Sequence, residues 1–198
     1  MRVAIHQPEH FPYMGFFQKM SASDLFVILD DVQYTKGGWQ NRNRFLNKNG
    51  VDDFFTVQVE RHANQKKINE VKVVEGPWRK KIVKKIQQNF NLDFENLYNK
   101  DKLIDINMAS IEWARKQLNI TTEIVMSSDL KINSTKTQRI LDICRSVGAT
   151  EYISGPGAVS EKTKSYLEPS LFTDIKLSIF YPKVDNYYSV LQNTKRTK

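Results

Sequence analysis

The sequence predicts a single α/β domain of Rossmann-like type, with a mainly parallel sheet, helices on both faces and an inserted β-hairpin. Short apolar runs of strand length alternate along the chain with amphipathic segments of helical spacing. Polar residues directly follow several of these runs, as they do at the ligand-binding edge of a parallel sheet. No internal repeat and no low-complexity linker interrupts the chain, so we expect one domain over residues 1–198.

The N-terminal stretch has the strand–helix–strand order of a parallel pair. Residues 3–5 have the length and composition of a buried strand, and Pro8 ends it because proline cannot donate to a sheet ladder. Residues 16–20 are amphipathic, and residues 25–29 are typical of a second strand. We expect the polar residues after both strands to meet at one edge of the sheet: His6 and Gln7 after the first, Asp30 and Asp31 after the second.

The middle of the chain contains a long loop and the expected hairpin. Residues 32–44 hold paired glycines and amide side chains, which predict either a binding loop or a solvated loop pinned by a buried Trp39. Residues 54–59 and 68–74 alternate apolar and polar positions and are expected to pair as antiparallel strands. The other expected elements are helices beginning near Pro77, Phe94, Ile104, Ser134 or Thr135, and Ser160, and strands at 123–126 and 151–153.

The net charge of +8, with a pI of about 9.4, could favour nucleic acid, anionic lipid headgroups or phosphorylated small molecules. The basic residues cluster at 66–67, 79–85 and 195–198 without any nucleic-acid-binding module, so a solvated basic face is favoured over nucleic-acid binding. No run approaches the roughly 20 apolar residues of a membrane span, and no signal peptide is recognisable. Cys144 is the single cysteine and is expected in the core, which excludes a disulfide framework and suits a cytoplasmic protein.

Three strand ends carry side chains or turns that could do chemistry. His6 could act as a general base because imidazole titrates near neutral pH, and Asp30 or Asp31 could orient it; a histidine that only caps the sheet edge is the competing interpretation. The Ser-Gly-Pro-Gly turn at 154–157 could present backbone N–H groups to a phosphate or an oxyanion, or could simply connect a strand to a helix. Ser127 and Ser128 follow a further strand at the same edge.

A set of motifs in this order closely resembles the WbqC-like family. They are Ile5-His6-Gln7-Pro8, Gly15, Leu29-Asp30-Asp31-Val32-Gln33, Trp39-Gln40-Asn41-Arg42-Asn43, Trp78-Arg79-Lys80-Lys81, Ser127-Ser128, Lys136-Thr137 and Tyr152-Ile153-Ser154-Gly155-Pro156-Gly157-Ala158. The resemblance implies a bacterial enzyme of surface-polysaccharide biosynthesis, of the O-antigen type. Its expected reaction is acyl or aminoacyl transfer to the amine of a nucleotide-linked amino sugar, with acyl-CoA or a carrier-protein thioester as donor.

The expected site combines a catalytic group with a larger binding set. His6 with Asp30 or Asp31 is assigned the chemistry, and Lys36 and Arg42 are assigned the diphosphate of the sugar donor. The other residues assigned to substrate binding are Gln7, Gln33, Trp39, Asn41, Ser127, Ser128, Ser154, Gly155 and Gly157. No metal site is expected.

Two other functions fit the sequence. A strand, a loop and a helix around His10-Phe11-Pro12-Tyr13-Met14-Gly15 loosely resemble nucleotidyltransferases, which predicts an adenylate-forming or nucleotidyl-transfer enzyme. A non-catalytic module that binds a sugar nucleotide or a partner enzyme is the third interpretation. An acyl carrier protein is the expected partner where the donor is a carrier-protein thioester. The chain departs from the family after Tyr181-Pro182, where family members usually continue with a further apolar segment. Here residues 183–198 are mostly polar, and the basic tail at 190–198 is expected to be flexible. A short C-terminus of this kind could lack part of the family's site.

Overall fold

The computed structural model describes residues 1–159 and 167–193, which form two compact units. The first unit consists of Met1–Gln7, Gly15–Leu29 and Ile120–Lys183, and the second of Pro8–Met14, Asp30–Asn119 and Val184–Lys198. The helix expected from Ser160 and the end of the basic tail, 194–198, lie outside the described residues. Within the described ranges, no helix is long and apolar enough to cross a membrane.

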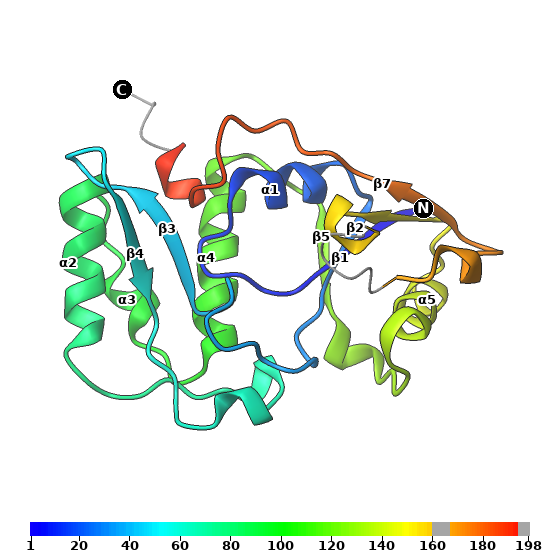
Figure 1. Cartoon of the computed structure of the whole chain (residues 1–198), viewed down its shortest axis with the longest axis horizontal. Helices are drawn as coiled ribbons and strands as arrows, with labels where there is room; N and C mark the ends of the chain where they lie inside the picture. The colour runs from blue at the N-terminus through cyan, green and yellow to red at the C-terminus, as the bar shows by residue number, and fades with distance from the viewer. Residues whose placement is uncertain (160–166, 194–198) are drawn as a thin grey trace. The chain divides into compact units, whose positions relative to one another are not determined.

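The first unit is built on a five-stranded sheet with the order β5-β2-β1-β6-β7 (Figure 1). Its strands are β1 (Arg2–His6), β2 (Leu25–Ile28), β5 (Glu123–Met126), β6 (Glu151–Ser154) and β7 (Lys176–Ile179). All four pairings are parallel, which confirms the predicted sheet. The sequence pattern did not predict β7, because only Leu177 and Ile179 of its four residues are apolar.

Helices cover both faces of this sheet, as predicted. The side chains of Val3, Ile5 and Val27 point to one face, where they pack in a cluster with Ile140 and Ile143 of α5 (Lys136–Ser146). The other face holds Ala4 and Phe26 and is covered by α1 (Met14–Ser21), whose Phe16 ring lies 5.1 Å from the ring of Phe26. The alternation follows from the two-residue period of a strand, since successive side chains point to opposite faces.

The second unit surrounds an aromatic core. Its elements are β3 (Arg42–Leu46), β4 (Asp52–Thr56), α2 (Trp78–Phe90), α3 (Glu95–Tyr98) and α4 (Leu103–Gln117), and α2 runs beside the β3–β4 hairpin (Figure 1). The ring of Phe55 contacts those of Phe45, Phe11 and His10, with centroids 5.3, 6.0 and 5.5 Å away. Apolar residues at helical spacing bury one face of α2, which ends where Asn91 adopts the left-handed conformation.

The predicted hairpin exists, but the predicted strand partners were wrong. β4 pairs with β3, whose first residue falls inside the expected loop 32–44, through pairs such as Asn43 with Phe55. Residues 68–74 begin with a 3₁₀ helix and contribute two isolated bridges, one between Val59 and Val73 and one between Lys72 and Lys102. The error has a physical origin: β3 has only two apolar side chains, and its alternation is carried by a buried Asn43 between two arginines.

Short 3₁₀ helices fill the connections. They are η1 (Ala63–Gln65), η2 (Ile68–Glu70), η3 (Ser127–Leu130), η4 (Pro156–Ala158), η6 (Pro169–Leu171) and η7 (Val190–Gln192). Val190 and Leu191 of η7 are fully buried, although they fall in the range expected to be a flexible tail. The Val190 N–H donates to the carbonyl of Pro12 at 2.8 Å, so this segment is part of the second unit.

Candidate functional site

The carboxyl edge of the first unit's sheet has the topology of a ligand site. From β1 the chain moves to β2 and then β5 on one side, and it returns to β6 and β7 on the other side of β1. In open α/β sheets, ligands bind outside the carboxyl ends of strands where the strand order reverses. This reversal lies between β1 and β6, so the candidate site lies where His6 ends β1 and Ser154 ends β6.

The first-unit residues of the predicted site follow these strand ends. Ala4 of β1 is in register with Ile153 of β6, so His6 and Gly155 each lie two residues beyond this pair. Ser127 opens η3 directly after β5, and β2 separates β5 from β1. The structure therefore puts His6, Gln7 and the 154–157 turn at neighbouring strand ends, and Ser127 and Ser128 at the same edge but two strands from β1.

His6 is held as a neutral imidazole. Its Nδ1 lies 3.0 Å from the carbonyl oxygen of Gln7, so Nδ1 carries the proton and donates, and Nε2 is the unprotonated ring nitrogen. The ring meets Phe16 edge-on, with centroids 4.9 Å apart. Burial and the positive charge of Lys19 lower the pKa of His6 to about 3, against the opposing effect of the Gln7 hydrogen bond. The imidazole is thus a hydrogen-bond acceptor at Nε2 throughout the neutral pH range.

Lys19 is a buried cation near the end of β1 that the sequence analysis did not single out. It is almost fully buried on α1, and its Nζ donates to the carbonyl of Ile5 at 3.2 Å and lies 5.9 Å from the centre of the Phe26 ring. Its place on the buried side of an amphipathic segment, between Phe16 and Met20, was the available signal. A cation fixed here keeps the end of β1 electropositive.

The 154–157 turn offers fewer unbonded N–H groups to a ligand than the sequence suggested. Pro156 has no N–H, and the N–H groups of Ala158 and Val159 donate to the carbonyls of Gly155 and Pro156. Ser154 is fully buried and its carbonyl accepts from the N–H of Phe180 at 2.8 Å. A Cβ placed on Gly155 would meet no heavy atom of the described residues within 4 Å, so the backbone here borders open space.

The other predicted site residues belong to the second unit: Asp30, Asp31, Gln33, Lys36, Trp39, Asn41 and Arg42. Asp30 is buried, and its carboxylate accepts a 3.1 Å hydrogen bond from the side chain of Asn69. His6 and the two aspartates thus belong to different units, and their pairing stays a prediction. Gln33 donates to the carbonyl of Asn64 at 2.7 Å, and Asn41 donates to that of Val57 at 3.0 Å, so both amides hold the second unit's backbone.

The glycine loop of the second unit exposes its aromatic residue instead of burying it. Trp39 is 45% exposed, which excludes the interpretation of a loop pinned by a buried tryptophan. Lys36 is also exposed, while Arg42 begins β3 with its guanidinium 5.4 Å from the ring of Phe54. Gly37 has φ +75° and lies beside Arg42, with 3.9 Å between its Cβ position and Nη2.

Cys144 and His10 are both core residues, because each side chain is fully buried. Cys144 lies fully buried on α5, and burial raises the pKa of its thiol to about 12, so it is a core residue as predicted. His10, the histidine of the nucleotidyltransferase-like pattern, is fully buried and its Nε2 lies 3.0 Å from the hydroxyl of Tyr98. It is a core side chain of the second unit. Across 1–159 and 167–193, no three His, Cys, Asp or Glu side chains gather as a metal-binding group would require.

Comparison with known proteins decides the family. The WbqC-like protein family matches residues 7–195, nearly the whole chain. The chain belongs to the WbqC-like family. It is 29% identical over 199 residues to an uncharacterized protein of Mycobacterium tuberculosis, Rv1507c, with 94% of this chain and 84% of that protein covered. No solved structure matches the chain. The family name is linked to an O-antigen gene cluster, so membership in the WbqC-like family supports a polysaccharide-related role at the level of the family.

Proposed function

We propose that this protein transfers an acyl or aminoacyl group from a thioester to the amine of a nucleotide-linked amino sugar during surface-polysaccharide assembly. The observation that carries the proposal is the neutral His6 at the end of β1, next to the reversal of strand order. With Nδ1–H donating to the Gln7 carbonyl, the Nε2 lone pair is the ring's proton acceptor. Amide formation requires such an acceptor, because the attacking nitrogen must lose a proton.

The reaction balances without any oxidant or metal. The amine nitrogen attacks the thioester carbonyl, a C–N bond forms, and the carbonyl oxygen becomes an oxyanion. The C–S bond then breaks, and the proton released by nitrogen passes through Nε2 of His6 to the departing sulfur. A ring whose pKa is about 3 does not deprotonate a free ammonium, so the amine enters in its neutral form. It transfers its proton to Nε2 only in the transition state, as the C–N bond forms and the nitrogen gains positive charge.

The rest of the edge has supporting roles in this proposal. The buried ammonium of Lys19 keeps His6 neutral before the reaction, since a second positive charge beside it is unfavourable. The Gly155 N–H is the proposed donor to the oxyanion, and the open space beside its Cα admits the substrate. Gln7 fixes the imidazole through its carbonyl oxygen.

The test is a product assay on the full-length protein. UDP-linked amino sugars are incubated with acyl-CoA donors in one arm, with carrier-protein thioesters in a second, and with ATP and free amino acids in a third. We expect an amide product by mass spectrometry in a thioester arm, with one thiol released per product. ATP–pyrophosphate exchange without thioester use would replace the proposal with an adenylating enzyme. Saturable sugar-nucleotide binding without product in any arm would replace it with a binding module.

A further inference from the structure

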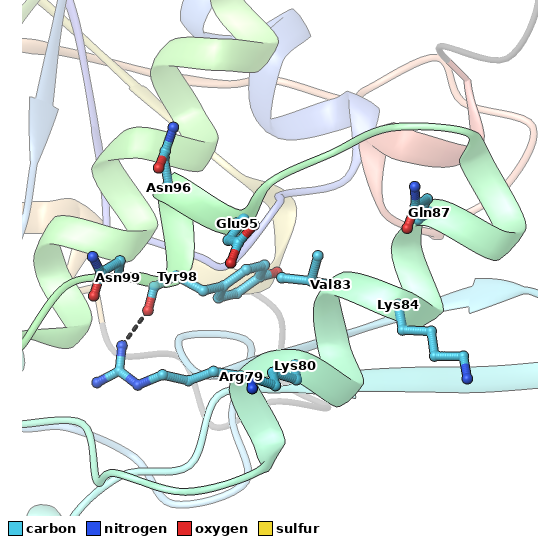
Figure 2. A pocket seen from close by; sticks show the side chains of 9 residues that line it. All are labelled: Arg79, Lys80, Val83, Lys84, Gln87, Glu95, Asn96, Tyr98 and Asn99. Carbon is cyan, nitrogen blue, oxygen red and sulfur yellow. Dashed lines mark hydrogen bonds between the residues drawn. The ribbon is translucent and has the colours of Figure 1, made fainter.

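A groove in the second unit lies between α2 and α3 and shares no residue with the candidate site (Figure 2). Its volume is about 670 Å³, within the range of roughly 300–1,000 Å³ that is usual for small-molecule sites. Arg79, Lys80, Val83, Lys84 and Gln87 line it from α2, and Glu95, Asn96, Tyr98 and Asn99 line it from α3 and the residue after it. A single phosphate ion would leave most of this space unfilled, so the groove fits a larger molecule.

The charge of the lining is positive, with three cations and one carboxylate. Arg79 is already engaged: Nη1 donates to the carbonyls of Tyr98 and Lys100, and Nη2 donates to Glu75 at 3.0 Å. Figure 2 shows its side chain reaching toward the end of α3, so Arg79 fixes the groove's shape. Lys80 and Lys84 are the cations left for a ligand.

Lys80 and Lys84 lie one turn apart on α2, and both are exposed. Like charges at this spacing repel each other, which disfavours the helix unless an anion lies between them. The charge of Lys85 on the same helix is neutralised within the protein, because its Nζ donates to Asp53 and to the Phe54 carbonyl, each at 2.8 Å. In the part of the chain that the structure describes, neither Lys80 nor Lys84 has an ion pair.

The remaining lining is suited to hydroxyl groups. Gln87, Asn96 and Asn99 present exposed amides, each with two N–H donors and a carbonyl acceptor, which can bind hydroxyls in either direction. Val83 adds an apolar contact between the helices, next to the buried ring of Tyr98 (Figure 2). A ligand that satisfies these groups carries one negative charge, several hydroxyls and a less polar ring face.

We propose that this groove binds an anionic saccharide. Its phosphate or carboxylate lies between Lys80 and Lys84, and its hydroxyls bind the amides of Gln87, Asn96 and Asn99. The site goes beyond the proposed transfer reaction, because it uses a different unit of the protein and none of the same side chains.

The test is calorimetric titration of the full-length protein with four probes: glucose 1-phosphate, glucuronic acid, glucose and inorganic phosphate. We expect saturable binding of at least one anionic sugar, at least about tenfold tighter than glucose and inorganic phosphate. The comparison between glucose 1-phosphate and glucuronic acid identifies the anionic group. No saturable binding of either anionic sugar, or equal affinity for glucose or for inorganic phosphate, overturns the proposal.

Matched variants separate this site from general charge attraction. The double variant Lys80→Gln/Lys84→Gln should weaken binding of the anionic sugar at least about tenfold. The control Lys81→Gln/Lys116→Gln removes the same charge from exposed lysines outside the groove and should change the affinity less than about twofold. Asn96→Ala/Asn99→Ala should lower the affinity for the sugar to that for inorganic phosphate. Equal losses in the charge variant and its control, or no loss in the amide variant, refute the site.

Discussion

His6 and His10 are four residues apart, and they have the same lowered pKa but lie in different units of the protein. Burial lowers the pKa of each to about 3. His6 ends a strand of the parallel sheet in the first unit, and its ring is fixed by the adjacent Gln7 carbonyl. His10 lies in the aromatic core of the second unit, bonded to Tyr98 and surrounded by phenylalanine rings. A low pKa is therefore common to both histidines and does not distinguish them. The catalytic proposal for His6 rests instead on its position at a strand end next to the strand-order reversal.

The largest expected effect is a loss of turnover when His6 is replaced, which would distinguish His6 from His10. His6→Gln retains hydrogen-bonding groups but lacks an imidazole, so it should lower kcat for amide formation by roughly 10²–10⁴, the usual range for positioned acid–base catalysis. KM for the sugar should change much less, because the proton transfer stabilises the transition state selectively. The measurement is steady-state kinetics with saturating substrates, accompanied by thermal melts.

His10→Gln is the matched control. It should lower stability but leave kcat of the folded fraction within about twofold, because His10 is a fully buried core residue. A His6→Gln variant that folds and turns over at the wild-type rate would make His6 a structural residue like His10.

The second effect concerns the stability of the second unit. Tyr98→Phe removes the hydroxyl that bonds to His10 Nε2, and the Nδ1 of His10 already lacks a partner among the described residues. Leaving the buried ring without a hydrogen bond should cost about 1–3 kcal/mol in the free energy of unfolding. Urea denaturation measures it.

Tyr188→Phe provides the control for that loss. It removes a hydroxyl that donates to Asp52 at 2.6 Å in a solvent-exposed position, where water can replace the bond. We expect a change within about 0.5 kcal/mol. Equal losses for the two variants would show that the His10–Tyr98 pair contributes no more than a surface contact.

The third effect is a dependence of stability on pH. The unfolded state protonates His10 near the ordinary histidine pKa of 6.5, whereas the folded state does so only near 3, so the unfolded state binds more protons between these values. The free energy of unfolding should therefore fall as the pH is lowered through this window, by up to about 1.4 kcal/mol per pH unit for a fully buried histidine.

Measuring between about pH 6.5 and pH 5 isolates the histidines, because carboxyls of lowered pKa, such as those of Asp142 and Asp174, stay ionised in the folded state there. His10→Gln should flatten the slope of unfolding free energy against pH in denaturant titrations. An unchanged slope would show that His10 does not carry the linkage.

The sequence predicts the fold of the first unit better than that of the second. Four strands of the first unit are marked by apolar runs bounded by polar residues, and parallel pairing follows from the intervening helices. The hairpin of the second unit was mispaired because β3 contains Arg42, Asn43 and Arg44, residues more typical of loops. Its register depends on Asn43 being buried, where it donates to the carbonyls of His10 and Phe11. Such a long-range partner is not visible in local periodicity.

The candidate site shows the same limit. The position of His6 at a strand end could be predicted, and so could the neighbouring 154–157 turn, because a parallel sheet aligns its carboxyl ends. The buried Lys19 was missed despite its place between Phe16 and Met20, because lysine side chains are almost never fully buried. The groove between α2 and α3 could not be predicted either. The sequence assigned Lys80 and Lys84 to a solvated basic face and did not show that α3 packs opposite them.

The smallest expected effect is the loss of stability when glycines with different backbone conformations are replaced by alanine. Gly148 in the first unit and Gly50 in the second have φ values of +71° and +74°, and a Cβ on either would meet no heavy atom of the described residues within 4 Å. Alanine at either position should therefore cost about 1 kcal/mol of unfolding free energy through backbone strain alone.

Gly155 is the informative contrast, because it has equal room for a Cβ but an ordinary φ of −76°. Gly155→Ala should leave the unfolding free energy within about 0.5 kcal/mol of the wild type, since alanine adopts this conformation without strain. Its methyl group would occupy the open space proposed for substrate, so KM should rise or kcat fall several-fold while Gly148→Ala changes neither. If Gly155→Ala matches the wild type in both stability and kinetics, the turn after β6 serves only as a connection in the chain. The oxyanion donor must then be sought elsewhere along the edge that His6 occupies.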